Sequence, residues 1–449
     1  MSTAPTTNFD PRAINAFQFT YRSLQPDGLV RLGYALDDIE FEETLQLPAP
    51  RFRGLPAVEG LLDLLHWVAG VSYFKAAIPR HLVCETGAPP PAAERLLAAL
   101  YSEGLGEFAV VNKLEQLPHP QFPRGVDWET VAERRPINSL LVPVGGGKDS
   151  AVAIEIARSS GLETTLFSLG DALPISATAN VAALPRHLVT RQIDPRLFEL
   201  NARGALNGHV PITAIVSCVA LLTAATQGID AVLMANERSA SAGNFSWNGV
   251  EVNHQFSKSR RAERLLADAV TEIEGAPQIF SILRPASELA IASAFAKLEQ
   301  YHPVFTSCNR VFQLDPDQRL GTWCCDCDKC RFVFLILAPF LVPAKLTEIF
   351  GRDMLDDPEQ YDGFALLTAT GGDKPFECVG EVDECLAAIE ILSGHELWQQ
   401  HANVRRLAEE VLARRGGVGE AEMSDHFALS DDHDIPDALI QPVREVLGA

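Results

Sequence analysis

Six residues about a third of the way along the chain have the types and spacing of a phosphate-binding turn. Residues 139–144 form an apolar run that predicts a buried strand, and three glycines, Gly145–Gly147, follow it directly. Lys148, Asp149 and Ser150 come next, and the apolar residues then recur at helical spacing. Glycines let backbone N–H groups converge on an anion, and a helix N-terminus adds partial positive charge. The pattern therefore predicts that this turn binds phosphate.

The turn does not have the composition of a Walker-type P-loop. Val142 stands where that motif has its first glycine, and Asp149 stands where it has Ser or Thr. The sequence instead resembles the Ser-Gly-Gly-x-Asp-Ser loop of the N-type ATP pyrophosphatases (PP-loop enzymes), with Gly145 replacing the first serine. That resemblance implies a HUP-type fold and cleavage of ATP to AMP and pyrophosphate, with adenylation of a substrate oxygen. A glycine turn without a ligand is the alternative.

Four cysteines form a second group with the spacing of a metal site. Cys324, Cys327 and Cys330 have a Cys-x2-Cys-x2-Cys pattern, and Cys308 lies upstream. Backbone turns at this spacing can present thiolates to one tetrahedral ion. The same order occurs in cyano-deazaguanine synthases, which are PP-loop enzymes with a structural zinc. We expect structural zinc; an iron–sulfur cluster and plain buried cysteines are the alternatives.

Three further segments carry side chains suited to catalysis or substrate binding. Glu237 and Arg238 follow a predicted strand at residues 231–236, where Arg238 could hold a carboxylate or phosphate and Glu237 could hold Mg²⁺ or a ribose hydroxyl. A hairpin signal, Asn248-Gly249, precedes a segment rich in basic and polar residues. The loop at residues 371–381 places Cys378 among carboxylates. Solvated turns are the alternative reading of each.

The composition is that of a globular chain with more than one domain. The chain has 449 residues, a hydrophobic fraction of 47% and a formal net charge of −22. This length exceeds one ordinary core, and so acidic a balance disfavours nucleic acid as a partner. The longest apolar runs, Phe332–Val342 and Ile212–Ala225, are shorter than the roughly 20 residues of a membrane span. We expect a cytoplasmic protein with a small-molecule substrate and no membrane partner.

The order of predicted elements indicates three domains. Alternation of apolar and polar residues over 16–47 predicts an antiparallel meander, followed by helices, in an N-terminal domain of residues 1–125. Strands and helices then alternate, which predicts a doubly wound parallel α/β sheet in a PP-loop domain of residues 126–345 that includes the cysteines. Residues 346–449 predict a helical extension, with an amphipathic helix at 395–414 and a loose or surface-docked acidic tail.

Over most of its length the sequence resembles the MurL-type UDP-N-acetylmuramoyl-L-alanyl-L-glutamate epimerases. The segments that carry the resemblance are Tyr34–Asp37, Pro143–Ser150, Ala235–Ser239, Val252–Ser259, Cys327–Leu335 and Pro375–Gly380. That family inverts the terminal L-glutamate of the nucleotide-linked dipeptide to D-glutamate for peptidoglycan synthesis. It consumes ATP and releases AMP and pyrophosphate. The resemblance implies UDP-N-acetylmuramoyl-L-Ala-L-Glu as the substrate and ATP with Mg²⁺ as cofactors.

The resemblance and the local patterns together give three sets of candidate residues. The expected ATP-binding residues are Gly145, Gly146, Gly147, Lys148, Asp149 and Ser150, with Lys148 neutralising phosphate charge and Asp149 holding Mg²⁺. The substrate-binding candidates are Arg238, Asn253, His254, Lys258 and Arg260. The catalytic candidates are Lys148, Asp149, Glu237, His254, Lys258, Cys378 and Glu381. No spacing selects the acid and the base of the epimerisation among them.

Two other functions fit parts of the sequence. A PP-loop enzyme that modifies a nucleobase or tRNA, by thiolation or nitrile synthesis, would account for the cysteines but not for the net charge. A module that senses a nucleotide without turning it over would need only the glycine turn. Pyrophosphate release with each candidate substrate distinguishes the three. The oligomeric state does not follow from the sequence.

Overall fold

The computed structural model describes residues 8–126, 136–243, 245–313, 316–370, 372, 374–375 and 377–448. These residues divide into two compact units. Unit 1 takes its residues from Met1–Leu141, His187–Val232 and Ser246–Ile279, and unit 2 takes its residues from Val142–Arg186, Leu233–Phe245 and Phe280–Ala449. Each unit is therefore assembled from segments that are distant in sequence.

Unit 1 begins with the predicted antiparallel meander. Strands β1 (Ala16–Leu24), β2 (Leu29–Leu36) and β3 (Ile39–Gln46) pair in sequence order, and β4 (His81–Cys84) pairs in parallel with β1. Burial alternates at Phe17 and Phe19 of β1 and along β3, as the sequence pattern predicts. Residues 32–36 of β2 are instead all buried, so this part of the meander lacks the predicted solvent-exposed face. The meander is not separate from the rest of the chain, because β3 pairs antiparallel with β7 (Arg186–Gln192).

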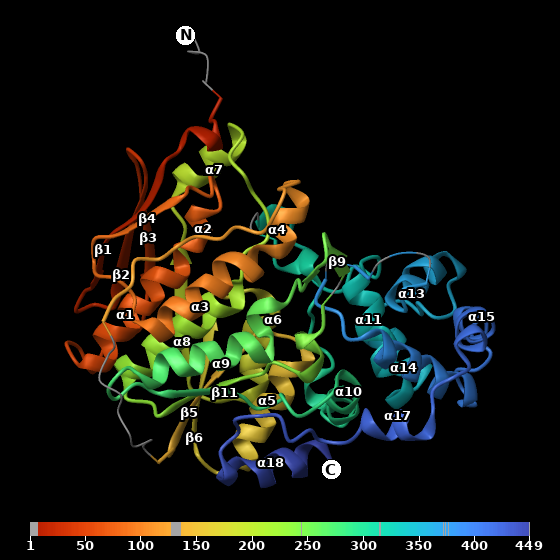
Figure 1. Ribbon diagram of the computed structural model, residues 1–449. Coiled ribbons are helices and arrows are strands. Elements are labelled where there is room, and N and C mark those ends of the chain that lie inside the picture. Colours follow the sequence, from red (N-terminus) through yellow and green to blue (C-terminus); the bar gives the residue numbers. More distant parts are fainter. Residues whose placement is uncertain are drawn as a thin grey trace. The chain divides into compact units, whose positions relative to one another are not determined.

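Helices pack against the meander in unit 1. Figure 1 shows α1 (Pro56–Ala69) beside the first strands, and α1 contacts both β1 and α8 (Ile212–Gln227). Helix α3 (Pro91–Ser102) packs against α9 (Arg260–Thr271). The shorter helices of this unit are α2 (Val71–Phe74), α4 (Gly106–Val111) and α7 (Pro195–Ala202).

The predicted alternation of strands and helices is present from residue 139 on. The elements are β5 (Ser139–Pro143), α5 (Lys148–Ser159), β6 (Glu163–Leu169), α6 (Leu173–Ala182), β8 (Ala231–Met234) and β11 (Gln278–Ser281). Strands β5 and β8 pair in parallel. The strand order β11-β8-β5-β6-β7-β3-β2-β1-β4 makes one mixed sheet. The prediction of a parallel α/β sheet is thus correct in part: the meander extends it with antiparallel strands, since an uncovered strand edge readily accepts a further strand.

The hairpin signal at Asn248-Gly249 is confirmed. Strands β9 (Phe245–Trp247) and β10 (Val250–Val252) form a separate two-stranded sheet. Asn248 and Gly249 between them have φ angles of +50° and +80°. Positive φ at both central residues is the requirement of a type I′ turn, whose twist matches that of the strands.

The C-terminal part of unit 2 is helical, as predicted, but one helix begins later than expected. Its elements are α10 (Glu288–Ala296), α11 (Asp328–Leu337), α12 (Pro343–Phe350), α13 (Tyr361–Leu367), α14 (Val382–Gly394), α15 (Ala402–Leu407), α16 (Ala413–Arg415), α17 (Glu420–Asp425) and α18 (Asp437–Leu447). The helix predicted at 395–414 starts at Ala402 and contains a π-helical turn at Ala408–Leu412. His395 is instead the C-cap of α14, and the buried Trp398 lies in the connection, with Nε1 donating to Leu341.

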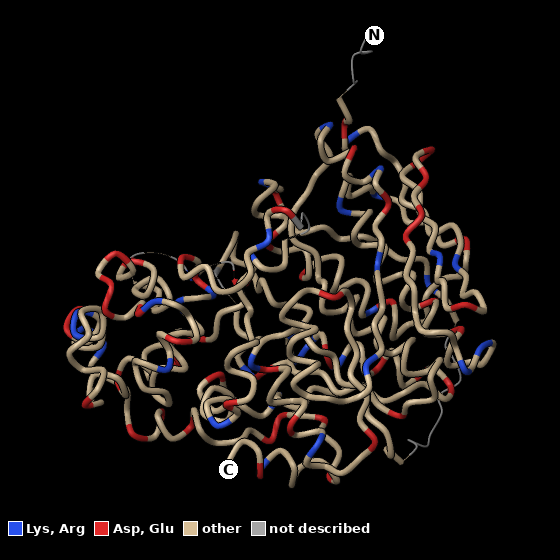
Figure 2. Tube along the Cα trace, turned by 180° about the vertical axis from the view of Figure 1, so that it is seen from behind, with Lys and Arg blue, Asp and Glu red and all other residues tan. Residues whose placement is uncertain are grey.

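The tail of the chain packs on the core of unit 2. Helix α18 contacts α5 and α10, and Figure 1 shows it beside α5. Asp and Glu are spread along the whole trace and interspersed with Lys and Arg (Figure 2). Among the helices in the part of the chain that the structure describes, none combines the length and apolar character needed to cross a bilayer.

Candidate active site

The glycine turn joins β5 to α5 in unit 2. Gly146 has a φ of +82°, which glycine adopts without strain. A Cβ atom at Gly146 would lie 2.8 Å from Pro174, whereas a Cβ atom at Gly145 would meet no other described atom within 4 Å. Gly147 is the N-cap of α5, so the free N–H groups of the first helical turn begin directly after the glycines. The predicted strand, turn and helix start are confirmed.

Lys148 is buried at the start of α5 and paired with two carboxylates. Its side chain is 3% exposed, and its Nζ donates hydrogen bonds to Asp149 and to Glu288. Glu288 is 2% exposed and is the first residue of α10. Burial lowers the pKa of Lys148, but the two carboxylates more than offset this and hold the pKa above its usual value. The lysine is therefore a fixed positive charge.

The first turns of four helices, α5, α10, α11 and α14, meet around this pair. Glu384, in the first turn of α14, accepts hydrogen bonds of 2.7 Å from the N–H of Glu288 and 2.7 Å from the N–H of Glu381. Lys329, in the first turn of α11, donates to the carbonyl oxygen of Cys378, and its charge acts on Glu288. Helix N-termini stabilise negative charge, so this arrangement suits buried carboxylates and a bound phosphate alike.

The carboxylates in this region do not all ionise at neutral pH. Burial and the neighbouring Glu288 raise the pKa of Glu384 to about 8, although the two backbone hydrogen bonds lower it. Burial also raises the pKa of Glu288, which Lys148 lowers and Asp149 and Glu237 raise. Like charges at close range cannot all be ionised without a counterion. The carboxyl groups of this cluster therefore either bind protons or attract cations.

The loop after β8 is tied to the loop after β11, and both lie in unit 2. Asn236 Nδ2 donates to Ser281 Oγ at 3.0 Å, and Arg284 Nη1 donates to the carbonyl oxygen of Glu237 at 2.6 Å. These bonds are buried, and they hold the two residues that directly precede Arg238. Glu237 itself is buried and acts electrostatically on Glu288. The loop that the sequence singles out thus belongs to the same group of charges.

A polar cavity of about 450 Å³ opens beside this group. Glu381, Asp383 and Glu384 at the start of α14 line it together with Arg238 and His426. Burial raises the pKa of Glu381, while Lys374 and Arg238 lower it. Burial lowers the pKa of His426, and the Arg238 guanidinium lowers it further. The cavity therefore combines a guanidinium with a titratable carboxyl group.

The four predicted cysteines come together in unit 2. Their Sγ atoms are separated by 3.9 Å between Cys308 and Cys327, 3.6 Å between Cys324 and Cys330, and 3.5 Å between Cys327 and Cys330. All four Sγ atoms lie within 4.8 Å of one another. Cys325 is separate, because its Sγ donates to the carbonyl oxygen of Phe350 at 3.2 Å. The four sulfurs have the donor set and spacing that fit one tetrahedral ion.

The basic segment after the hairpin lies in unit 1, where acidic or amide groups pair with its side chains. His254 Nδ1 contacts the carboxylate of Glu107. Lys258 Nζ donates to Gln255 Oε1 at 3.3 Å, Asn253 Oδ1 accepts from the Gln255 N–H at 2.7 Å, and the buried Arg260 donates to Glu263 at 3.1 Å. Much of the positive charge expected for substrate binding here is therefore balanced within the unit.

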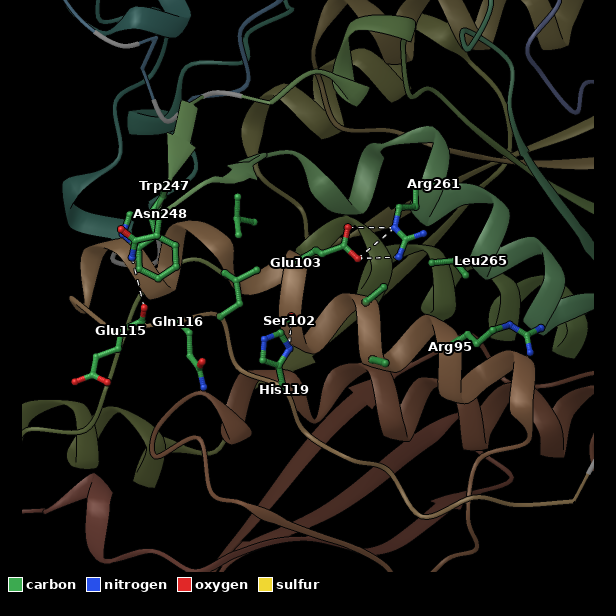
Figure 3. A pocket seen from close by; sticks show the side chains of 14 residues that line it. Arg95, Ser102, Glu103, Glu115, Gln116, His119, Trp247, Asn248, Arg261 and Leu265 are labelled. Carbon is green, nitrogen blue, oxygen red and sulfur yellow. Dashed lines mark hydrogen bonds and ion pairs between the residues drawn. The ribbon is translucent and has the colours of Figure 1, made fainter.

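A second cavity, of about 710 Å³, lies in unit 1 among α3, α9 and the β9–β10 hairpin. Figure 3 shows Trp247 and Asn248 on one side of it and the ion pair between Arg261 and Glu103, at 2.9 Å, on another. His119 Nδ1 lies 3.3 Å from Ser102 Oγ in its wall. Glu103 therefore neutralises Arg261 in the wall of this cavity, which Arg95 also lines.

Comparison with protein families assigns the chain. The model of the MurL N-terminal domain matches residues 8–282, and the model of the MurL C-terminal domain matches residues 304–421. The chain belongs to the MurL family.

Curated relatives match this chain over most of its length. A protein of Micromonospora is 42% identical over 95% of this chain and 97% of its own length, and one of Xanthomonas oryzae pv. oryzae is 38% identical over 97% and 98%. A protein of Salinispora tropica is 42% identical over 91% of this chain and 88% of its own length. All three are named UDP-N-acetyl-alpha-D-muramoyl-L-alanyl-L-glutamate epimerase. No solved structure matches the chain.

In this MurL chain the nominated catalytic and substrate-binding residues fall into two sets, one in each unit. Those in unit 2 are Lys148, Asp149, Glu237, Arg238, Cys378 and Glu381, and those in unit 1 are Asn253, His254, Lys258 and Arg260. Sequence reasoning missed the residues that the first set surrounds or contacts, namely Glu288, Lys329, Lys374 and Glu384. Ser287-Glu288 and Glu381-x-x-Glu384 have the pattern of ordinary helix N-termini, so the sequence gives no sign that Glu288 and Glu384 belong to the site. Of the loop at 371–381, Gly371, Asp373 and Phe376 lie outside the described residues.

Proposed function

We propose that this protein is an ATP-dependent epimerase that converts the terminal L-Glu of UDP-N-acetylmuramoyl-L-Ala-L-Glu to D-Glu in peptidoglycan precursor synthesis. The observation that carries the proposal is the similarity over nearly the whole chain to relatives that bear this epimerase name, at 38% to 42% identity. The buried charge cluster of unit 2 supplies a site with the chemistry that such a reaction needs.

The glycine turn is the proposed binding site for the ATP phosphates, as in the PP-loop enzymes that it resembles. The backbone N–H groups of Gly145–Gly147 and the N-terminus of α5 would contact the phosphate oxygens. Lys148 lies at this N-terminus as a permanent cation, held by Glu288. A cation next to phosphate oxygens stabilises the negative charge that accumulates as pyrophosphate leaves.

Adenylation solves a chemical problem of this epimerisation. Removing the α-hydrogen next to a carboxylate would give a dianion, which is strongly disfavoured. In the proposed reaction a carboxylate oxygen attacks the α-phosphorus of ATP, the bond to the β-phosphate oxygen breaks, and pyrophosphate leaves. The resulting mixed anhydride can delocalise the carbanion electrons onto its carbonyl oxygen. A proton then returns to the opposite face, and water hydrolyses the anhydride to the D-glutamate carboxylate and AMP.

Glu381 is the proposed acid/base group in the polar cavity. A catalytic acid or base works best when its pKa is near the operating pH, and burial shifts Glu381 in that direction. Its side chain is only half-buried and lines the cavity, whereas Glu384 is buried and accepts two backbone hydrogen bonds. Arg238 in the same cavity wall is suited to hold a substrate carboxylate in bidentate geometry.

Two metals complete the proposal. Asp149 and Glu288 are suitably placed carboxylates for Mg²⁺, which would neutralise phosphate charge when bound with ATP. The four cysteines Cys308, Cys324, Cys327 and Cys330 are the proposed ligands of a structural zinc ion, since four sulfur ligands leave no open coordination position.

Incubation with UDP-N-acetylmuramoyl-L-Ala-L-Glu, ATP and Mg²⁺ tests the function. Hydrolysis of the product and chiral analysis should give D-Glu, with one AMP and one pyrophosphate per inversion. Glu381→Gln keeps the side-chain carbonyl that caps α14, so it should still release pyrophosphate but invert glutamate at least about 100-fold more slowly. Asp383→Asn, in the same cavity wall, is the matched control and should retain activity. ADP formation, or inversion without ATP, would contradict the proposal.

A further inference from the structure

We propose that Glu107, His209 and His254 of unit 1 form a binding site for a divalent transition metal ion of the zinc class. One ligand atom from each of these side chains lies within 4.8 Å of the others. The Nδ1 atom of His209 lies 3.8 Å from Glu107 Oε2, and the His209 and His254 rings are 4.5 Å apart between centroids. The site is separate from the four cysteines, which are in unit 2. It does not rest on the proposed function.

Three segments that are far apart in sequence bring these ligands together, and two glycines let them approach. Glu107 lies in α4, between residues that pack on the other two segments. A Cβ atom at Gly106 would lie 3.0 Å from Val252, two residues before His254, and one at Gly104 would lie 3.2 Å from Pro211, two residues after His209. Side chains at either glycine would push the ligand segments apart.

Further contacts hold the ligand-bearing loops in place. Lys75 Nζ donates to Asn207 Oδ1 and, at 3.3 Å, to the carbonyl oxygen of Gly208, next to His209. Asn112, which caps the C-terminus of α4, donates to the carbonyl oxygen of Asn207 at 2.9 Å. On the other side, the Asn253 side chain accepts from the N–H of Gln255 at 2.7 Å and fixes the turn around His254. Ligands held by such contacts lose little freedom when they bind an ion.

The donor set selects the kind of ion. Two imidazole nitrogens and one carboxylate oxygen suit Zn²⁺ and neighbouring first-row ions, whereas Mg²⁺ and Ca²⁺ prefer oxygen ligands alone. Three protein ligands leave a coordination position open for water or a ligand. All three side chains are partly exposed, at 14% to 20%, so an ion can reach them from solvent.

The alternative is a simple ion pair between His254 and Glu107, with His209 as a neighbour. His209 Nδ1 is too far from the Glu107 carboxylate for a hydrogen bond, although the ring is largely enclosed. A neutral imidazole keeps a lone pair on one ring nitrogen, and this is the form of His209 that can bind a metal ion. An ion pair leaves that lone pair unexplained, whereas a metal ion uses all three groups.

Metal content and affinity test the site in the full-length protein. Chelator-treated protein is loaded with Zn²⁺, desalted, and analysed by plasma mass spectrometry, and Co²⁺ binding is followed by its visible absorption. His209→Gln and Glu107→Gln should each bind one equivalent of zinc less than the unmodified protein, with at least about 100-fold weaker affinity. His119→Gln is the matched control, because His119 is an exposed histidine of the same unit that contacts Ser102 instead (Figure 3).

The Co²⁺ spectrum separates this site from the cysteines. Bound to nitrogen and oxygen ligands, Co²⁺ gives visible ligand-field bands without the near-ultraviolet sulfur charge-transfer bands of a thiolate site. We expect the former bands in the unmodified protein and in His119→Gln, and their loss in both site variants. Equal zinc content in all four proteins, or a Co²⁺ spectrum of the unmodified protein with sulfur bands only, would overturn the proposal even if one site variant failed to fold.

Discussion

Replacing Lys148 by methionine should destabilise the protein in a way that depends on pH. The substitution keeps the length of the side chain but removes the cation that pairs with Glu288, which is 2% exposed and cannot regain water without unfolding. Breaking a buried pair by removing one partner typically costs 3–5 kcal/mol, since a charge is left unpaired.

The pKa of Glu288 sets an upper limit on this cost. Without Lys148, Glu288 can take up a proton in the folded state, which costs about 1.4 kcal/mol for each pH unit above its ordinary pKa of 4.5. At pH 7 the limit is therefore about 3.5 kcal/mol. Because the folded pKa is raised above the unfolded value, stability is retained at low pH and lost as the pH rises. The destabilisation should grow by about 1.4 kcal/mol between pH 6 and pH 7.

Urea denaturation at pH 5.5, 6.5 and 7.5, followed by tryptophan fluorescence without nucleotide, measures this effect. The double variant Lys148→Met/Glu288→Gln is the control, because it has no carboxyl group left to protonate at that position. It should lose less stability than the single variant at pH 7.5 and should not show the added dependence on pH. A single variant as stable as the unmodified protein at pH 7.5, or a loss independent of pH, would refute the assignment of a buried ion pair.

Three other experiments test separate parts of the structure. The pKa of Glu384 is about 8 in the folded protein and 4.5 in the unfolded chain, so the stability that Glu384 contributes is lost as the pH rises between these values. The melting temperature should therefore fall from pH 5 to pH 8, and Glu384→Gln should make this fall smaller. Gly146→Ala should abolish ATP-dependent AMP release, because the new Cβ would collide with backbone atoms at a residue that has a positive φ. Gly145→Ser is the control and should retain AMP release. Equal rates in the two variants would count against the turn as the phosphate site. Cys330→Ser should lower the zinc content by one equivalent and the melting temperature by several degrees, whereas Cys325→Ser should leave the zinc content unchanged.

The local structure around the glycine turn could be predicted because it depends on neighbours in sequence. An apolar run, three glycines and a helical period are enough to give β5, the turn and α5. The type I′ hairpin at Asn248-Gly249 and the cysteine cluster follow from spacing in the same way. In each case the physical constraint acts over a few residues or through a short loop.

The environment of the site could not be predicted, because it depends on packing between distant helices. Glu288 and Glu384 are 96 residues apart, and Lys148 and Glu288 are 140 residues apart, yet they bond to each other. In the sequence, Glu288 and Glu384 are acidic residues in the first turns of helices, where acidic residues are common because they stabilise the helix N-terminus. The pairing of Lys148 and the raised pKa of Glu384 follow only from burial. The same limit explains why the helix predicted at 395–414 begins only at Ala402: the burial of Trp398 interrupts a pattern that looks continuously amphipathic in the sequence.

Deuterium uptake tests the central claim most directly. The protein is incubated in D₂O with UDP-N-acetylmuramoyl-L-Ala-L-Glu, ATP and Mg²⁺, and the recovered dipeptide is analysed by mass spectrometry and the nucleotides by chromatography. The proposed adenylation and proton transfer predict one non-exchangeable deuterium at the glutamate α-carbon of each inverted molecule, together with AMP. Exchange that proceeds equally well without ATP, or inversion that carries no deuterium, would contradict the account.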